Sequence, residues 1–188
     1  MKRADRIRFA TSLRSTLPFL HGRGPLLEVL PRGRVLRGVY LEGSSFNPGK
    51  LRAWAFVQPL FVPASSIVLT LGVRIGGNAA WGLGDESTLA AALAEEGRVH
   101  FETSTPSALL ELVSGLPGDQ ALEVKAYTLV AERRFGDGAD CLDALAAHLS
   151  AEEPLPWRLA VRERATHLAS LARTNPEAAL EQLVAWEA

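Results

Sequence analysis

The sequence predicts an α+β protein: a small antiparallel sheet of about three to four strands within residues 26–75, an N-terminal helix and a C-terminal set of helical hairpins. Apolar residues recur at every second position between turn signals in residues 34–75, which is the spacing of strands. Only short turns join these segments, which favours antiparallel neighbours because parallel strands need long crossovers. Beyond residue 86, apolar residues recur at steps of three and four, which is the spacing of helices.

The first elements are a helix and a short strand. Residues 3–17 have the spacing of an amphipathic helix, and Pro18 ends it because proline cannot continue the hydrogen-bond ladder. Residues 26–30 follow as a short strand before the turn at 31–33.

The central strands come next. Residues 35–42 alternate between an apolar face and a wetter face, and the turn cluster at 47–50 predicts a hairpin. The run at 51–62 is almost continuously apolar, as in a strand covered on both faces, but it must break or lie at an edge near Pro59. Residues 67–73 alternate again and predict a third strand.

Three pieces of this region form a recognisable pattern. They are Arg37-Gly38-x-Tyr40-x-Glu42-x-Ser44-Ser45-Phe46, Phe56-Val57-Gln58-Pro59-Leu60-Phe61-Val62-Pro63 and Leu71-Gly72-x-Arg74-Ile75. The pattern resembles one in uncharacterised bacterial proteins of similar size, and the resemblance covers roughly the first half of the chain. It implies one inherited module and brings with it no activity, cofactor or catalytic residue.

A glycine-rich passage between Gly76 and Gly84 leads from the sheet to a helix at 87–96. Glycines before a helix can cradle a phosphate, but the spacing matches neither glycine-rich fingerprint, and the acidic residues at the helix start would repel an anion. We interpret the passage as a flexible loop with Trp81 against the sheet. Ser87 is the expected helix cap, and residues 99–102 are expected to form an extended link.

The C-terminal part predicts successive helices. Thr105-Pro106 and Asn175-Pro176 each place a capping residue before a proline at the first helical position. Between them, Asp119 caps a helix to about residue 134, for which a strand at 123–130 is the alternative, and residues 135–138 form a tight connection. The expected inward residues of the next-to-last helix are Trp157, Val161, Ala165, Leu168 and Ala172. No fixed repeat period is visible, so a solenoid is not predicted.

The totals bound the domain organisation and the class of protein. At 188 residues, the chain is expected to form an α+β region at 1–118 with a helical region at 119–188 packed on it. A hydrophobic content of 47% and a net charge of −1 indicate a globular protein without general attraction to nucleic acid or anionic membranes. The single cysteine, Cys141, excludes an intramolecular disulfide and agrees with a reducing cytoplasm. Neither a secretory signal nor a membrane-spanning run is expected.

The sequence shows no catalytic motif. Its four histidines are scattered without metal-ligand spacing, so we expect no metal ion and no other cofactor. Cys141 and His148 are separated by two helical turns, about 10 Å, which is too far for a nucleophile and its base. The stretch from Gly43 to Phe46 lacks the second glycine of a hydrolase elbow, and the paired carboxylates lie in surface-like settings. Catalytic residues are therefore not assigned, and the chain is not expected to be an enzyme.

Charged residues inside the predicted sheet are the more informative feature. A buried arginine needs a partner, and Glu42 is the expected partner of Arg37 or Arg74. If these two arginines instead face one open groove with Tyr40 and Gln58, they form an anion or peptide-carboxylate site.

The leading hypothesis is a non-catalytic interaction protein of the bacterial cytoplasm, immunity-like or adaptor-like, that binds another protein. Missing catalytic motifs and aromatic residues in the strands favour it. Its expected contact residues are Arg37, Tyr40, Gln58, Arg74 and Trp81. The first alternative is an anion-binding or small-molecule protein, or an enzyme, with a pocket between the sheet and the glycine-rich loop.

The second alternative is nucleic-acid binding through the basic side of the first helix. Arg3, Arg6 and Arg8 would contact phosphates there, although a solvated amphipathic face explains the same residues. The near-neutral net charge makes nucleic acid the less favoured partner.

Overall fold

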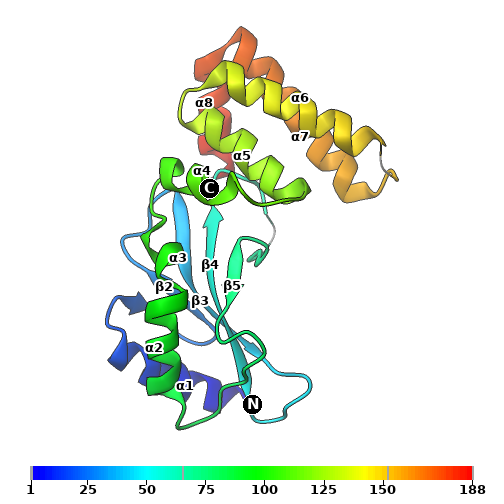
Figure 1. Cartoon of the computed structure of the whole chain (residues 1–188). Coiled ribbons are helices and arrows are strands. Elements are labelled where there is room, and N and C mark those ends of the chain that lie inside the picture. The colour runs from blue at the N-terminus through cyan, green and yellow to red at the C-terminus, as the bar shows by residue number, and fades with distance from the viewer. Residues whose placement is uncertain (1, 65, 152, 188) are drawn as a thin grey trace. The chain divides into compact units, whose positions relative to one another are not determined.

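The structure, a computed structural model, describes residues 2–64, 66–151 and 153–187 and confirms the α+β fold (Figure 1). Contacts within the chain divide it into two compact units. The sheet unit comprises the residues up to Gln58 together with Ile67–Ser104, and the helical unit comprises Pro59–Ser66 together with the residues from Thr105 onward. Residues 105–118, which the sequence analysis grouped with the sheet, fall into the helical unit in this division. The boundary at residue 118 stays a prediction.

The sheet unit holds an antiparallel sheet whose five strands are neighbours in chain order. The strands are β1 (Leu20–His21), β2 (Leu26–Val29), β3 (Val35–Gly43), β4 (Leu51–Pro59) and β5 (Gly72–Arg74). The helices of this unit are α1 (Arg3–Thr16), α2 (Glu86–Glu96) and α3 (Arg98–Glu102).

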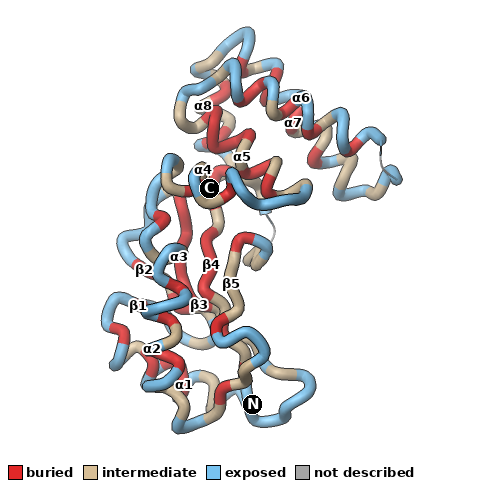
Figure 2. The backbone as a smooth tube through the Cα atoms, in the orientation of Figure 1, coloured by how far each residue is buried: buried red, intermediate tan, exposed pale blue. Residues whose placement is uncertain are grey.

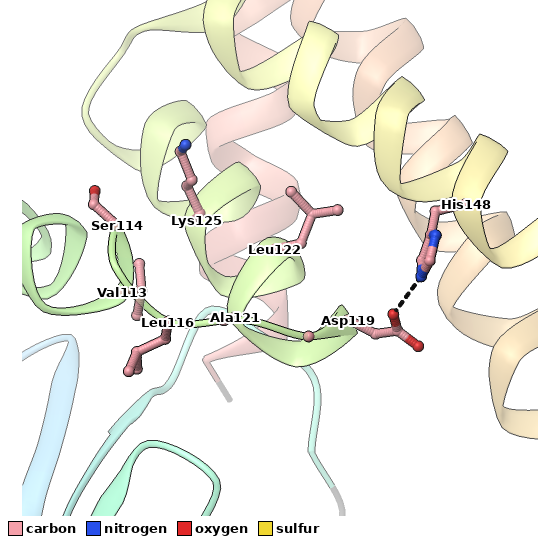
Figure 3. Close-up of a pocket in the computed structure, with 9 residues that line it drawn as sticks. Val113, Ser114, Leu116, Asp119, Ala121, Leu122, Lys125 and His148 are labelled. Carbon is pink, nitrogen blue, oxygen red and sulfur yellow. Dashed lines mark ion pairs between the residues drawn. The ribbon is translucent and has the colours of Figure 1, made fainter.

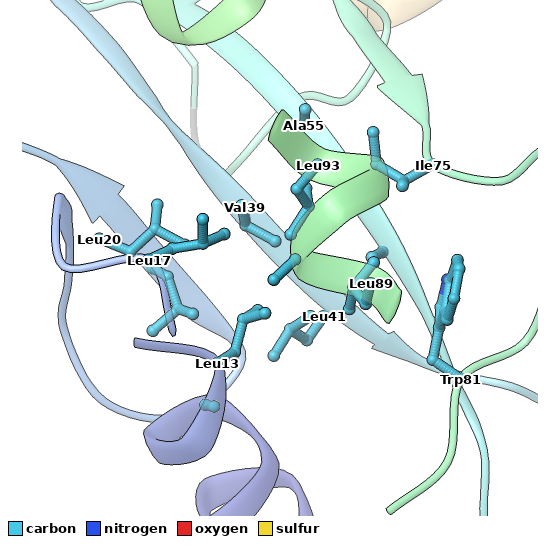
Figure 4. Close-up of a cluster of buried hydrophobic side chains, with 14 of the residues drawn as sticks. Leu13, Leu17, Leu20, Val39, Leu41, Ala55, Ile75, Trp81, Leu89 and Leu93 are labelled. Atoms are coloured by element: carbon cyan, nitrogen blue, oxygen red, sulfur yellow. The ribbon is translucent and has the colours of Figure 1, made fainter. Parts of the chain in front are cut away.

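One face of the sheet packs against α1 and α2 (Figure 4). Phe9 and Leu13 of α1 and Leu89 and Leu93 of α2 are fully buried, because they lie on the sheet-facing sides of their helices. The strands contribute every second residue to the same cluster, among them Leu27, Val39, Leu41, Ala53 and Ala55. Every second residue of the strands thus packs against every third or fourth residue of the helices in one core.

The predicted strands at 26–30, 35–42 and 51–62 correspond to β2, β3 and β4, and of the two outcomes expected near Pro59 the structure shows the break, since β4 ends at this residue. The wetter face of β3 begins only at Tyr40, because Leu36 and Gly38 are buried as well. Conversely, β4 is not covered on both faces along its first half, where Trp54 is half-buried.

The predicted third strand at 67–73 is wrong in extent, since β5 covers Gly72–Arg74 only. Residues before it bond elsewhere: the Val68 amide donates to the Gln58 side chain at 3.1 Å, and the Gly72 amide closes a turn onto the Leu69 carbonyl at 3.0 Å. These bonds occupy backbone groups that a longer ladder would need. The sheet also gains β1, which is not among the predicted strands.

Two expectations next to the sheet are also wrong. Residues 99–102 belong to the short helix α3 instead of an extended link, and Asp85 rather than Ser87 stands at the start of α2. Tertiary contacts explain α3: Arg37 of β3 donates to the Phe101 carbonyl at 2.7 Å, and Gly97 lets the chain approach Ala55 closely. Helix propensities of single residues contain no information about either of these tertiary contacts.

The helical unit consists of five helices among its described residues. They are α4 (Pro106–Val113), α5 (Asp119–Ala131), α6 (Phe135–Ala151), α7 (Pro156–Thr174) and α8 (Pro176–Trp186). Both predicted caps are confirmed: Thr105 Oγ1 accepts from the Ala108 amide at 3.2 Å, and Asn175 Oδ1 accepts from the Ala178 amide at 3.3 Å. Helix α5 packs against α4, α6 and α8, so it is buried around most of its circumference (Figure 2).

Three expectations for this unit are corrected. Residues 135–138 begin α6 instead of forming a connection, and the turn falls at Glu132–Arg134, where Arg133 has a φ of 61°. Gly138 is needed inside α6 because a Cβ there would lie 2.7 Å from Val130 Cγ2 of α5. Residues 123–130 are helical, so the alternative strand is wrong, and Gly118 rather than Asp119 is the N-cap.

The side of α7 that faces inward is only partly as predicted. Val161, Ala165, Leu168 and Ala172 are buried, whereas Trp157 is 50% exposed and lies beside the Arg158 guanidinium. Trp157 falls in the first turn of the helix, where fewer neighbouring residues surround a side chain.

Candidate interaction surface

The face of the sheet opposite α1 and α2 carries the candidate site. Residues paired directly across antiparallel strands share a face, and Tyr40 pairs with Leu26 while Arg74 pairs with Trp54. The Trp54 indole N–H donates to Glu42 Oε2 at 3.3 Å, which places β3 and β4 residues on the same side. We call this surface the open sheet face. Its half-buried residues include Leu26, Tyr40, Glu42, Arg52, Trp54 and Arg74.

The charges on the open sheet face are unequally compensated. Glu42 accepts the hydrogen bond from Trp54, and the Arg52 guanidinium lies 5.6 Å from the ring centroid of Phe46, a side chain that is 81% exposed. Arg74 makes no side-chain hydrogen bond or ion pair with any residue that the structure describes, and its Nε is shielded from solvent. Glu28, which shares this face through its pairing with Gly38, is neutralised by Arg32 at 3.3 Å, and the neutral indole N–H leaves the charge of Glu42 in place, so Arg52 and Arg74 give the face one positive charge in excess.

Arg37 lies on the other face, with Val39 and Leu41, because side chains two apart in a strand point the same way. Its guanidinium donates to the Phe101 carbonyl at 2.7 Å and to the Pro31 carbonyl at 3.0 Å. Burial lowers the pKa of Arg37, and the two carbonyl oxygens replace water around its charge. Its partners are thus backbone carbonyls of α3 and of the turn after β2, and Glu42 is not among them.

The other predicted contact residues also have structural partners. Gln58 accepts from the Val68 amide, and Trp81 is 9% exposed within the core and exchanges backbone hydrogen bonds with Leu51. Of the five predicted contact residues, the structure brings together Tyr40 and Arg74 on the open sheet face and separates Arg37 from Arg74 by the thickness of the sheet.

Sequence reasoning did not single out Trp54, which lies between Tyr40 and Arg74 in strand order. The signal was present: Arg52 and Trp54 alternate with Leu51, Ala53 and Ala55, an alternation hidden by the apolar character of the whole run.

The basic residues of α1 fall into two groups. Arg3 and Arg6 line a pocket together with Arg23 of the loop after β1. Arg8 instead bonds Asp5 of its own helix at 2.9 Å and does not line that pocket.

The helical unit contains a pocket of ≈ 340 Å³ that is lined by residues of α5, by His148 of α6 and by the end of α4 with the loop that follows it (Figure 3). His148 Nε2 lies 2.8 Å from Asp119 Oδ1, while Ser114 lies on the far side of the pocket and donates its hydroxyl to the Leu110 carbonyl at 2.6 Å. A serine nucleophile needs its base within hydrogen-bond reach, so these three side chains do not form a hydrolytic triad.

The helical unit also buries a polar cluster. Glu123 of α5 meets Arg164 of α7 at 3.3 Å, and burial raises the pKa of the Glu123 carboxyl while Arg164 acts in the opposite direction. The Tyr127 hydroxyl is buried near the Arg164 guanidinium without a well-formed hydrogen bond among the described residues, and the centroid of its ring lies 5.4 Å from that of Trp186. We interpret this cluster as structural, because its members join α5 to α7 and α8.

Among the described residues, no three histidine, cysteine, aspartate or glutamate side chains gather closely enough to hold a metal ion. Within the same part of the chain, no helix combines the length and the apolar character that crossing a bilayer requires. Comparison with protein-family models, with curated proteins and with solved structures found no match.

Proposed function

We propose that the chain is a non-catalytic interaction protein of the bacterial cytoplasm, of the adaptor or immunity kind, and that the open sheet face binds its protein partner. The observation that carries this proposal is the grouping of Tyr40, Trp54 and the unpartnered Arg74 on a half-exposed sheet surface. Tryptophan, tyrosine and arginine are the residues that dominate binding hot spots.

The backbone beneath these side chains supports a binding role. Trp54 and Arg74 are paired across β4 and β5, and the opposite face of β4 is anchored in the core by Ala53 and Ala55. A surface that is already ordered loses little conformational entropy when a partner binds, so more of the contact energy appears as affinity.

The charges on the open sheet face define the chemistry of the partner. Glu42 is already hydrogen-bonded by Trp54, whereas Arg74 has no acceptor among the described residues. The partner segment therefore carries a carboxylate for Arg74, together with apolar side chains that cover Trp54 and Tyr40.

A site-specific crosslinking experiment tests this proposal. A photoreactive phenylalanine at position 40 is expected to capture a partner in bacterial cells, whereas the same group at position 157 of the helical unit is not. The captured protein is then purified and titrated against the variants. Trp54→Ala and Arg74→Glu are expected to weaken binding about tenfold or more, the effect of a hot-spot residue.

Trp157→Ala is the matched control, because Trp157 is 50% exposed and lies outside the sheet unit. It is expected to change the affinity by less than about twofold, the variation of a residue outside the contact. Circular dichroism and thermal unfolding verify that each variant is folded. Equal affinity of Arg74→Glu and the unmodified chain would rule out the open sheet face as the binding surface.

A further inference from the structure

The strongest unexplained feature of the sheet unit is a pocket of ≈ 450 Å³ at the beginning of α1. Its walls come from the first two turns of α1 and from the loop between β1 and β2. The lining residues are Arg3, Arg6, Ile7, Arg23, Gly24 and Pro25.

Three guanidinium groups line this pocket without an acidic residue among the lining side chains. Arg3, Arg6 and Arg23 make no side-chain hydrogen bond or ion pair with the residues that the structure describes, and Arg6 Nε is shielded from solvent as well. Like charges held around one cavity repel each other, and an anion between them removes that repulsion. The pocket is thus built for a negatively charged ligand.

These arginines come from two elements, the helix α1 and the loop between β1 and β2. Arg3 and Arg6 are three residues apart, so they lie on one side of α1. Arg23 stands between Gly22 and Gly24, whose φ values of 115° and 84° favour glycine and set the path of the loop. Guanidinium groups approaching from two elements match the several oxygens of a tetrahedral anion.

The remaining lining residues extend the site beyond an inorganic anion. Ile7 is 42% exposed although its neighbours on α1, Phe9 and Ala10, are buried, and it lines the pocket with Pro25. An exposed apolar surface beside a cationic cavity fits a ligand whose charged group carries an organic substituent.

We propose that this pocket binds a small organic phosphate, with the phosphate held by Arg3, Arg6 and Arg23 and the organic part resting on Ile7 and Pro25. The arrangement favours a small ligand over a nucleic-acid strand. A strand would need a row of unpaired cations along α1, but Arg8, two residues beyond Arg6, is paired with Asp5. This site is independent of the open sheet face.

Calorimetric titration of the full chain with phenyl phosphate at low salt tests the proposal. Arg23→Ala and Arg6→Ala are each expected to weaken binding about tenfold or more, because each removes a charge-assisted bond to the phosphate. Arg8→Ala is the matched control, since it removes an arginine of the same helix that lies outside the pocket; its expected change is less than about twofold. Arg23 is exposed in a loop, so its variant reports on binding even if Arg6→Ala fails to fold.

Two further arms separate the possible ligands. Ile7→Ala is expected to weaken the binding of phenyl phosphate but not that of inorganic phosphate; equal effects on both would contradict the organic part of the proposal. A single-stranded oligonucleotide is expected to bind more weakly than phenyl phosphate per phosphate group. Tight oligonucleotide binding that also requires Arg8 would overturn the proposal in favour of nucleic acid. An absence of phenyl phosphate binding at millimolar concentration would overturn it as well. Arg74→Glu should leave phenyl phosphate binding unchanged. The phosphate pocket and the open sheet face can therefore be refuted independently of each other.

Discussion

The sheet unit and the helical unit use their buried surfaces differently. In the sheet unit, helices cover one face of β3 and β4, while Tyr40 and Trp54 on the other face stay half-exposed. In the helical unit, α5 is surrounded by α4, α6 and α8, and even its polar residues Glu123 and Thr128 are buried. A sheet has two faces, and one of them can stay exposed to bind a partner, whereas a central helix is covered by other helices on most of its sides. The proposed binding surface accordingly lies on the sheet.

The two units also differ in the kind of atom that an added side chain would meet at their most crowded glycines. Among the glycines of the sheet unit, an added Cβ would come closest to another atom at Gly38, where it meets a backbone carbonyl oxygen; among those of the helical unit it would do so at Gly138, where it meets the Val130 side chain. Side chains can change rotamer but paired backbones cannot shift independently, so the sheet unit should tolerate added volume less well.

Gly38→Ala gives the largest effect we expect. A Cβ at this position would collide with the Leu27 carbonyl oxygen and lie 3.2 Å from the Glu28 Cα of the neighbouring strand. We expect a loss of about 3 kcal/mol in the free energy of unfolding, measured by urea titration, with faster hydrogen exchange in β2 and β3. Gly43→Ala, at the end of the same strand, has no atom within 4 Å of the added Cβ and should change stability by less than about 0.5 kcal/mol.

Gly138→Ala should cost less. Its Cβ would lie 2.7 Å from Val130 Cγ2 and 3.1 Å from the Val130 amide nitrogen, but the valine can move, and alanine favours the helix by about 1 kcal/mol over glycine. We expect a net loss of about 1 kcal/mol in the free energy of unfolding, measured as faster amide hydrogen exchange in α5 and α6. Gly136→Ala, in the same helix and without close contacts, should instead stabilise it by up to about 1 kcal/mol. A larger loss for Gly138→Ala than for Gly38→Ala would reverse the comparison.

The buried Glu123 makes the stability of the helical unit depend on pH. Burial raises the pKa of this carboxyl from its ordinary value of 4.5, so the folded chain holds the proton more tightly than the unfolded chain. The resulting stabilisation is complete below pH 4.5 and is lost as the pH rises through the raised pKa. Relative to Glu123→Gln, the unmodified chain should therefore lose stability across this window in urea titrations at successive pH values.

Each unit of pKa shift corresponds to about 1.4 kcal/mol, so the Glu123 effect should be measurable even if the shift is small. Glu181→Gln, an exposed position on α8, is the control and should show no such trend. A stability difference between the Glu123 variant and the unmodified chain that grows in the opposite direction with pH would show that Arg164 outweighs burial.

Tyr127→Phe should have the smallest effect. Burial, and then the Glu123 carboxylate, raise the pKa of the Tyr127 hydroxyl, while the nearby Arg164 guanidinium acts in the opposite direction without a well-formed hydrogen bond among the described residues. Removing a hydroxyl that lacks a well-formed hydrogen bond, while keeping the tilted ring packed against Trp186, should leave the free energy of unfolding unchanged or raise it by up to about 1 kcal/mol in thermal unfolding. A loss larger than about 1 kcal/mol would reveal a hydrogen bond in solution.

Local chemistry decided which elements could be predicted from the sequence. The caps at Thr105 and Asn175 were predictable because the capping oxygen and the amide it accepts from are three residues apart. Helix α3 was not, because it is held by Arg37 from a strand more than sixty residues away. The start of α6 was missed for a similar reason: two glycines indicate a turn, but Gly138 is there to admit Val130.

The candidate site shows the same limit. Tyr40 and Arg74 were identified from the charged and aromatic pattern of the strands, but the face of each residue depends on strand register. Without that register, Arg37 and Arg74 looked equivalent, although one bonds backbone carbonyls among core residues and the other lies on the open sheet face.

The path of the chain between the units has a consequence for how the protein is made. Pro59–Ser66 belongs to the helical unit, yet it is inserted between two segments of the sheet unit. On the ribosome this octapeptide is synthesised before the helices with which it is grouped, so its contacts with them can form only after residues 105–187 have been made. No single cleavage point separates the units, and expressing residues 105–188 alone would omit a native part of that unit.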